Sequence, residues 1–323
     1  MSDVVRQLEI VGLEETLRWA DAEGKTPGRR RALRKRVEAA HEIMSELPPP
    51  NELSFLFSGM CQTALPHSRP AQNTDVWERT SGRFTLTVEP GVINRKHVGV
   101  PYGPKARLIL IHLQTEGVKS RTVNLGTSLS AFMRSLDLAV TGGKRGTISA
   151  VREQAMRIAR CRFTMQWREE KAEGARTIFH DTPIVDGMEM WESGGERWTE
   201  TVELSSRFYE TLKQHAVPLD KRAIARLAGN SLGLDLYTLL AYRLPKLQTG
   251  KPLEMRWSAL KLQIGADQQE TQGLARRIRN IMPEVIEAYP AANVEITRHG
   301  LLLRSSKPSV PKTMVQGRLI AVG

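Results

Sequence analysis

Apolar positions in the middle of the chain recur with the period of helices. Residues 106–118 are apolar on most sides, which is typical of a helix buried in a core. Residues 128–138 carry apolar side chains at spacings of three and four, as on one face of a helix. A turn at 141–146 precedes Thr147, which we expect to be the N-cap of a third helix ending near Cys161. The pattern therefore predicts three successive helices.

Short strand patterns lie between and after these helices. Residues 121–125 alternate like a strand between the first helix and the second. Residues 162–168 and 177–185 also read as strands, and they flank a charged segment, 169–174, that we expect to be a loop. Helix, strand, helix, turn, helix and hairpin is the order of a winged helix.

The same order of elements recurs about 130 residues later, in pattern and not in residue identity. Its expected elements are an apolar helix at 232–244, a strand at 253–256, a short helix at 258–264, a helix from 267 to 281 and a hairpin of 293–297 with 301–304. Asp267 with Glu270 resembles a capping box at the start of the long helix. Pro283 is expected to kink or restart that helix.

These patterns predict an α+β fold that is mainly α, with two tandem winged-helix domains and a helical N-terminal extension. The expected parts are a basic helical extension (1–50), a turn-rich connector with short strands (51–100), a first winged helix (101–204), a second winged helix (205–306) and a flexible C-terminal tail (307–323). Three prolines at 48–50 should end the extension, because proline cannot continue a helix.

The net charge of the chain indicates what kind of partner it binds. The 323 residues include 47 Lys and Arg against 35 Asp and Glu, a net charge of +12, which indicates a polyanionic partner such as nucleic acid or an anionic membrane. The charges are segregated. Residues 25–36 hold seven basic groups and no acid, residues 144–162 hold six basic groups and one acid, and residues 163–204 hold four basic groups and ten acids. Concentrated positive charge is typical of a surface that binds phosphates.

The sequence lacks the residues that several classes of function require. No apolar run approaches the ~18 residues needed to span a bilayer, and the first residues lack the apolar core of a signal peptide, so we expect a cytoplasmic protein. Cys61 and Cys161 form no metal or redox motif and should be reduced, buried thiols. Neither the histidines nor the lysines form a metal or phosphate-loop motif. We therefore expect no enzymatic activity, cofactor or metal.

The third helix of each copy should present arginines to solvent. At 100° per residue, Ile148, Val151, Ala155 and Ile158 share the core side of the first, and Leu274, Ile278 and Ile281 that of the second. Arg pairs with guanine, and Gln or Asn with adenine, in the major groove. The second helix is therefore the better candidate for base reading.

The candidate DNA-binding residues come from both copies. In the first copy they are Lys144, Arg145, Ser149, Arg152, Arg157, Arg160 and Arg162. In the second copy they are Gln269, Gln272, Arg276, Arg277, Arg279, Asn280, Arg298 and Arg304. We expect Lys144, Arg145 and Arg162, and at the second wing Arg298 and Arg304, to contact phosphates.

Each of these features has a second interpretation. An exposed helix with several arginines is often only a solvated face, and winged helices also mediate protein contacts. The basic run at 25–36 is either the solvated side of an amphipathic helix or a DNA-backbone arm. For the amphipathic interpretation, the residues expected to pack inward are Leu33, Val37, Ala40, His41 and Met44.

Short sequence motifs, referred to below as words, follow one another in order between residues 52 and 245. They are Cys61–Thr63, Leu65–His67, Val76–Arg79, Thr87–Gly91, Val100–Gly103, Ala106–Leu110, Leu129–Met133, Thr141–Lys144, Val151–Gln154, Val217–Asp220 and Leu234–Tyr237. Together they resemble the plasmid-encoded RepA replication initiators of broad-host-range bacterial plasmids. The words do not extend into the second copy's long helix.

The resemblance implies a non-enzymatic initiator that binds repeated iterons in double-stranded plasmid origin DNA. It further implies melting of adjacent A·T-rich DNA, recruitment of host DnaA and replicative helicase, and autorepression and copy control as a dimer that can dissociate into monomers. The rival interpretation is a winged-helix transcriptional repressor without a role in replication. A DNA-nicking enzyme is a third class, and its metal site and nucleophile partners are not visible in the sequence.

Overall fold

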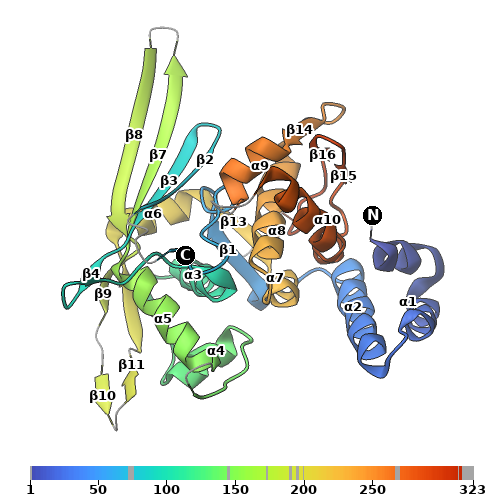
Figure 1. Ribbon diagram of the computed structural model, residues 1–323, viewed down its shortest axis with the longest axis horizontal. Coiled ribbons are helices and arrows are strands. Elements are labelled where there is room, and N and C mark those ends of the chain that lie inside the picture. Colours follow the sequence, from blue (N-terminus) through green and yellow to red (C-terminus); the bar gives the residue numbers. More distant parts are fainter. Residues whose placement is uncertain are drawn as a thin grey trace. The chain divides into compact units, whose positions relative to one another are not determined.

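Figure 1 shows a computed structural model of the chain. It describes residues 2–71, 76–143, 146–171, 174–188, 191–193, 196–198, 200–265, 270–311 and 313–314. The structure is mixed α/β and has two compact units. The central unit comprises residues 54–217 with 262–266, and the terminal unit comprises residues 1–53, 218–261 and 267–323. Most of the tail expected at 307–323 lies outside the described residues.

The central unit contains the first predicted series of elements in the predicted order. These are α3 (Gly103–Gly117), β6 (Thr122–Asn124), α4 (Leu129–Ser135), α5 (Thr147–Arg160), β7 (Arg162–Lys171) and β8 (Gly174–Pro183). Gly146, not Thr147, is the N-cap of α5, which corrects the sequence prediction. The Thr147 hydroxyl donates instead to the carbonyl of Ala139 and accepts from the backbone N–H of Thr141 at 3.0 Å, so it closes the preceding turn.

A four-stranded antiparallel sheet runs in the order β2-β3-β7-β8. Its first two strands, β2 (Trp77–Ser81) and β3 (Phe84–Glu89), come from the segment predicted to be a connector. β3 pairs with β7 from Phe84 opposite Trp167 to Glu89 opposite Arg162, so this segment and the hairpin share one sheet. The sequence did not reveal this pairing, because the two strands are far apart along the chain.

The β7–β8 hairpin is longer than the sequence predicted. Pairing continues to Lys171 opposite Gly174, so the charged segment expected as a loop, including Glu169 and Glu170, lies mostly within strands. The described residues 168–171 and 174–177 of the hairpin extend past Trp167, the last residue of β7 that pairs with β3, as Figure 1 shows. Runs of charged residues hide the apolar alternation of a strand when the strand leaves the core.

The remaining central elements complete the core of this unit. They are β4 (Val92–Ile93), β5 (Lys96–His97), β9 (Val185–Met188), β10 (Trp191–Ser193), β11 (Glu196–Trp198), β12 (Thr201–Leu204) and α6 (Ser206–His215). β6 pairs with β12, and β12 pairs with β9, in a three-stranded sheet. Met133 of α4, Phe163 of β7 and Phe208 of α6 are completely buried in one apolar cluster. The strands β1 (Leu53–Phe57) and β13 (Ala216–Asp220) each begin in one unit and end in the other.

The terminal unit contains the second predicted series. It includes α7 (Lys221–Leu227), α8 (Ser231–Arg243), β14 (Leu253–Arg256), α9 (Trp257–Ile264, whose last turn belongs to the central unit), α10 (Thr271–Ala288), β15 (Val294–Ile296) and β16 (Gly300–Leu303), with short 3-10 turns at Pro50–Glu52 and Leu244–Lys246. The three strands form an antiparallel sheet in the order β14-β16-β15. The strand β14, between α8 and α9, therefore pairs with β16, the last strand of the hairpin.

The long helix α10 differs from its prediction at both ends. It begins at Thr271 after Glu270, whose side chain makes no capping hydrogen bond, and Asp267 lies outside the described residues. The helix continues through Pro283 to Ala288. Proline removes one backbone hydrogen bond. Residues on both sides of it, Met282 and Val285, are buried, and this packing holds the helix together past the proline.

The N-terminal extension is a pair of helices, α1 (Asp3–Glu23) and α2 (Pro27–Ser45), so its helical prediction is confirmed. The side chains that pack the two helices together are Val4, Leu8, Ala20, Val37 and Ala40, with Leu33 and Met44 partly buried beside them. Of the residues predicted to pack inward beside the basic run at 25–36, this cluster therefore contains Leu33, Val37, Ala40 and Met44, whereas His41 is partly exposed. Within α1, Gly12 has φ 74° and interrupts the helical geometry.

Both cysteines are free and buried, as the sequence predicted. Burial raises the pKa of the Cys161 thiol to about 12, so this thiol stays protonated and unreactive at neutral pH. Among the described residues, no helix has the length and apolar character needed to cross a membrane.

Candidate nucleic-acid interface

Helix α5 buries the side that the sequence assigned to the core. Val151 and Ile158 are completely buried, and Ile148 and Ala155 pack partly against the same cluster. The opposite side exposes Ser149, Arg152 and Arg160. Arg160 donates from Nη2 to the Val92 carbonyl at 3.3 Å and still lies exposed. The helix therefore presents a polar face with two cationic side chains to solvent.

The Arg157 side chain contacts other residues of the protein instead of extending into solvent. Its Nη1 donates to the Val100 carbonyl at 2.9 Å, and its Nη2 donates to Oε1 of Glu153 at 2.8 Å. The guanidinium also lies 5.1 Å from the centre of the Tyr102 ring, and only 12% of the side chain is exposed. A Cβ at Gly99, which has φ +76°, would overlap the guanidinium. Arg157 thus holds the segment before α3 against α5.

Arg157→Met is therefore expected to lower the stability of the protein by about 1–2 kcal/mol, because three interactions of a mostly buried charged group are lost. The slope of log affinity for DNA against log salt should stay unchanged, whereas Arg152→Ala should reduce it by about one phosphate contact. Urea unfolding and a salt titration of DNA binding measure the two effects. A changed salt slope in Arg157→Met at unchanged stability would assign this residue to DNA instead.

One further candidate of the first copy lies at the base of the hairpin. Arg162, in β7, pairs with Asp181 of β8 at 3.1 Å, and their side chains are 61% and 45% exposed. Such an exposed pair contributes little energy, so the guanidinium is able to exchange this partner for a phosphate. Lys144 and Arg145 lie outside the described residues.

Helix α10 presents a larger polar face. Leu274 and Ile278 are completely buried and Ile281 is 7% exposed, as the sequence predicted. The candidates on the opposite side are all exposed: Gln272, Arg276, Arg277, Arg279 and Asn280. The Arg279 guanidinium lies 5.2 Å from the centre of the Trp257 ring, at the start of α9. This stacking limits the directions in which Arg279 can extend. Gln269 lies outside the described residues.

The β15–β16 turn is anchored to α9. The Trp257 indole donates to the Arg298 carbonyl at 3.0 Å, and the Trp257 backbone N–H donates to the His299 carbonyl at 2.9 Å. These bonds fix the backbone and leave the Arg298 side chain exposed. Arg304 pairs with Glu295 at 2.9 Å across the strands, and their side chains are 40% and 57% exposed. The structure thus brings α10 and this hairpin together in one unit.

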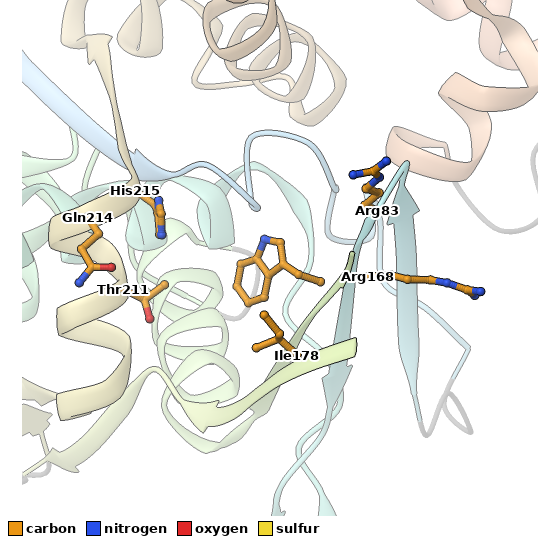
Figure 2. Close-up of a pocket in the computed structure, with 7 residues that line it drawn as sticks. Arg83, Arg168, Ile178, Thr211, Gln214 and His215 are labelled. Atoms are coloured by element: carbon orange, nitrogen blue, oxygen red, sulfur yellow. The ribbon is translucent and has the colours of Figure 1, made fainter. Parts of the chain in front are cut away.

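A hollow of about 360 Å³ lies between the base of the β7–β8 hairpin and α6, and Figure 2 shows its walls. Its lining residues are Arg83, Trp167, Arg168, Ile178, Thr211, Gln214 and His215. Figure 2 shows Thr211, Gln214 and His215 on one wall, and the Arg168 guanidinium directed away from them. The Thr211 hydroxyl donates to the Arg207 carbonyl at 2.9 Å, and none of the lining residues that the structure describes carries a carboxylate. Sequence reasoning missed this site because its residues come from three distant segments.

Comparison with known proteins finds a plasmid replication family over the middle of the chain. Residues 100–258 match the family model described as "Plasmid encoded RepA protein", so this segment is similar to that family. The resemblance inferred from the sequence is thereby confirmed. The matched segment ends at the start of α9, so it includes α5 and does not include α10.

Solved structures of the protein RctB are also similar to the chain. A selenomethionine derivative of RctB domains 2 and 3 has a TM-score of 0.43 and 13% identity, and the match covers 69% of this chain and 83% of that one. Another structure of domains 2–3 has a TM-score of 0.42 and 13% identity, with coverages of 73% and 83%. No curated protein matches the sequence significantly.

Proposed function

We propose that the chain is a plasmid replication initiator that binds iteron repeats in double-stranded origin DNA through α5 and α10. The single observation that carries this proposal is the exposed set of arginines and amides on α10, opposite a completely buried face, in a chain whose middle segment is similar to the RepA family. Exposed arginines with Gln272 and Asn280 beside them match the donors and acceptors of base edges in the major groove.

The order of helices and strands in each unit supports this mode of binding. In the terminal unit, the order α8, β14, α9, α10, β15, β16 and the sheet order β14-β16-β15 are those of a winged helix, with α10 as its third helix. In the central unit the order is the same, but the hairpin pairs with β3 and β6 pairs with β12. The second wing would place Arg298 and Arg304 on the DNA backbone, and Arg162 at the base of the first hairpin would do the same.

The proposal includes origin opening without enzymatic chemistry. When two domains of one protein bind successive grooves, the duplex bends or untwists. The A·T-rich steps then open first, because they deform most easily. Host DnaA and the replicative helicase would then be recruited, and a dimeric form would repress the initiator's own gene.

Plasmid maintenance tests the proposal. A plasmid that carries the origin and lacks other replication genes should be maintained when this protein is supplied and lost when it is not. In vitro, added protein should produce a footprint over the repeats and permanganate-reactive thymines beside them. A footprint without maintenance would favour the alternative, a winged-helix repressor. Cleavage of supercoiled plasmid with a divalent metal would show a nicking enzyme.

A further inference from the structure

A completely buried carboxylate attaches the N-terminal helices to α10. Glu287 accepts from the Ser2 hydroxyl at 2.6 Å and from Nη2 and Nε of Arg36 at 2.7 and 3.2 Å. Nη2 of Arg226, in α7, also donates to it. The hydrogen bonds that Arg36 donates to Glu287 raise the pKa of Arg36, whereas burial lowers the pKa of Arg226. Four segments, the start of α1, α2, α7 and α10, therefore meet at one residue of the terminal unit.

This attachment lies on the same side of α10 as its candidate base-reading arginine. Glu287 follows Arg276 by eleven residues, which at 100° per residue brings it to within about 20° of Arg276 around the helix. At a rise of 1.5 Å per residue, the two positions are roughly 16 Å apart along the axis. A major groove is about 12 Å wide, so α2 would lie outside the groove that holds Arg276, beside phosphates further along the duplex.

The exposed part of α2 and its preceding turn is strongly cationic. Of the seven basic residues in 25–36, Arg34 pairs with Asp21 at 2.6 Å, and Arg36 pairs with Glu287. The five others are exposed: Lys25, Arg29, Arg30, Arg31 and Lys35. We call these five residues the α2 basic face.

The position of these charges in the helix is unfavourable in isolation. Arg29, Arg30 and Arg31 lie in the first turns of α2, and no acidic residue occurs in its first turn. The N-terminus of a helix carries a partial positive charge, so three cations there repel it, and a bound anion relieves this repulsion. A face that served only for solubility would more favourably carry acidic residues at this end.

We propose that the α2 basic face contacts the phosphate backbone of the same duplex whose bases α10 reads. The inference rests on the proposed function, since it takes α10 as the base-reading helix. Double-stranded DNA is the favoured polyanion, because the buried cluster at Glu287 holds α2 next to the helix that would lie in the groove. The N-terminal helices thus extend the contact beyond the repeat itself, into its flanking sequence.

The experiment uses the full chain and two duplexes, one ending at the repeat and one with about 15 additional base pairs on each side. The variant R29Q/R30Q/R31Q removes three charges from the α2 basic face. The matched control, R18Q/K119Q/K251Q, removes three exposed charges elsewhere. A third variant, R29K/R30K/R31K, keeps the charges. Affinity is measured as a function of salt, together with the preference for the repeat over a scrambled repeat.

On the long duplex, the glutamine variant is expected to bind about 5- to 50-fold more weakly at 0.15 M salt, and its salt slope should fall by about two to three. On the short duplex, wild type and this variant should bind alike. The lysine variant should retain most of the slope, because phosphate contacts depend mainly on charge. The preference for the repeat should be unchanged in every variant.

Other outcomes overturn the inference and separate it from the proposed function. Equal salt slopes for the glutamine variant and the control would make the α2 basic face a solvated surface. Weaker binding to phosphatidylglycerol vesicles with unchanged DNA binding would assign the face to a membrane. If wild type shows no preference for the repeat, the proposed function fails; if the preference is present and the slopes are equal, only the inference fails. Circular dichroism and thermal unfolding confirm that each variant is folded.

Discussion

Arg276→Ala combined with Arg279→Ala is expected to weaken binding to the cognate repeat by about 2–6 kcal/mol, or at least about 30-fold. Both guanidiniums are exposed on the face of α10 opposite Leu274, Ile278 and Ile281, where a groove would meet them. Each arginine that donates two hydrogen bonds to a guanine contributes about 1–3 kcal/mol to the preference for that base over the others. The double variant should therefore also bind with less base specificity. Competition binding between the repeat and single-base variants of it measures both effects.

Two further variants sharpen this result. Arg18→Ala removes an exposed arginine that pairs with Glu15 on α1, and it should leave the base preference unchanged. Arg276→Lys keeps the charge and loses the planar fork, so it should resemble the alanine variant in base choice and wild type in salt slope. If the double variant weakens binding to scrambled DNA as much as to the repeat, both arginines touch phosphate only.

Glu287→Gln is expected to lower the free energy of unfolding of the terminal unit by about 3–5 kcal/mol. The carboxylate is completely buried, and Arg226, with only 8% of its side chain exposed, would remain as an uncompensated charge. Removing one partner of a buried ion pair costs more than the pair contributes, because the other charge stays out of water. Hydrogen exchange of α10 amides, or urea unfolding followed by the Trp19 and Trp257 fluorescence, measures the loss.

The exposed ion pair between Glu295 and Arg304 provides the control for the Glu287→Gln variant. Glu295→Gln removes a carboxylate whose side chain is 57% exposed, and it should cost no more than about 1 kcal/mol. A second variant, E287M/R36M/R226M, replaces the whole cluster with apolar side chains and should recover much of the stability. A Glu287→Gln protein as stable as Glu295→Gln would show that the buried cluster does not fasten the N-terminal helices.

Local patterns predicted the helices well, because each helix buries one face and its apolar spacing records that face. The bounds expected for α8 and α9 lie within one or two residues of those observed. Pro283 misled the prediction of α10, since the sequence shows the lost hydrogen bond and not the tertiary packing of Met282 and Val285 that compensates for it.

Sheet pairing was less accessible from the sequence. The alternation at 83–88 indicated a strand, but nothing local showed that β3 would pair with β7, some 80 residues later. Long-range pairing depends on which edges remain free after the core forms, and a single sequence does not record it. The extension of the hairpin to Lys171 was hidden for a different reason, because its residues alternate poorly between apolar and polar.

Wheel arithmetic placed the candidate site residues on the correct faces and did not identify their partners. Ser149, Arg152 and Arg160 are exposed, as expected. Arg157 lies on the same side of α5, but its guanidinium reaches the Val100 carbonyl, which approaches from another segment. Glu287 had no signal in the sequence, because a buried glutamate is recognisable only by the arginines that surround it.

The Glu287 cluster also sets an order of events during synthesis. Glu287 lies 251 residues after Arg36, so at ribosomal rates of about 5–20 residues per second it emerges roughly 12–50 s later. Most of the central unit is a continuous segment, residues 54–217, and can fold in that interval. The N-terminal helices can pair with each other early, since their contacts are local. Their docking onto α10 must be a late step, and a nascent chain released before residue 287 would leave Arg36 without its carboxylate.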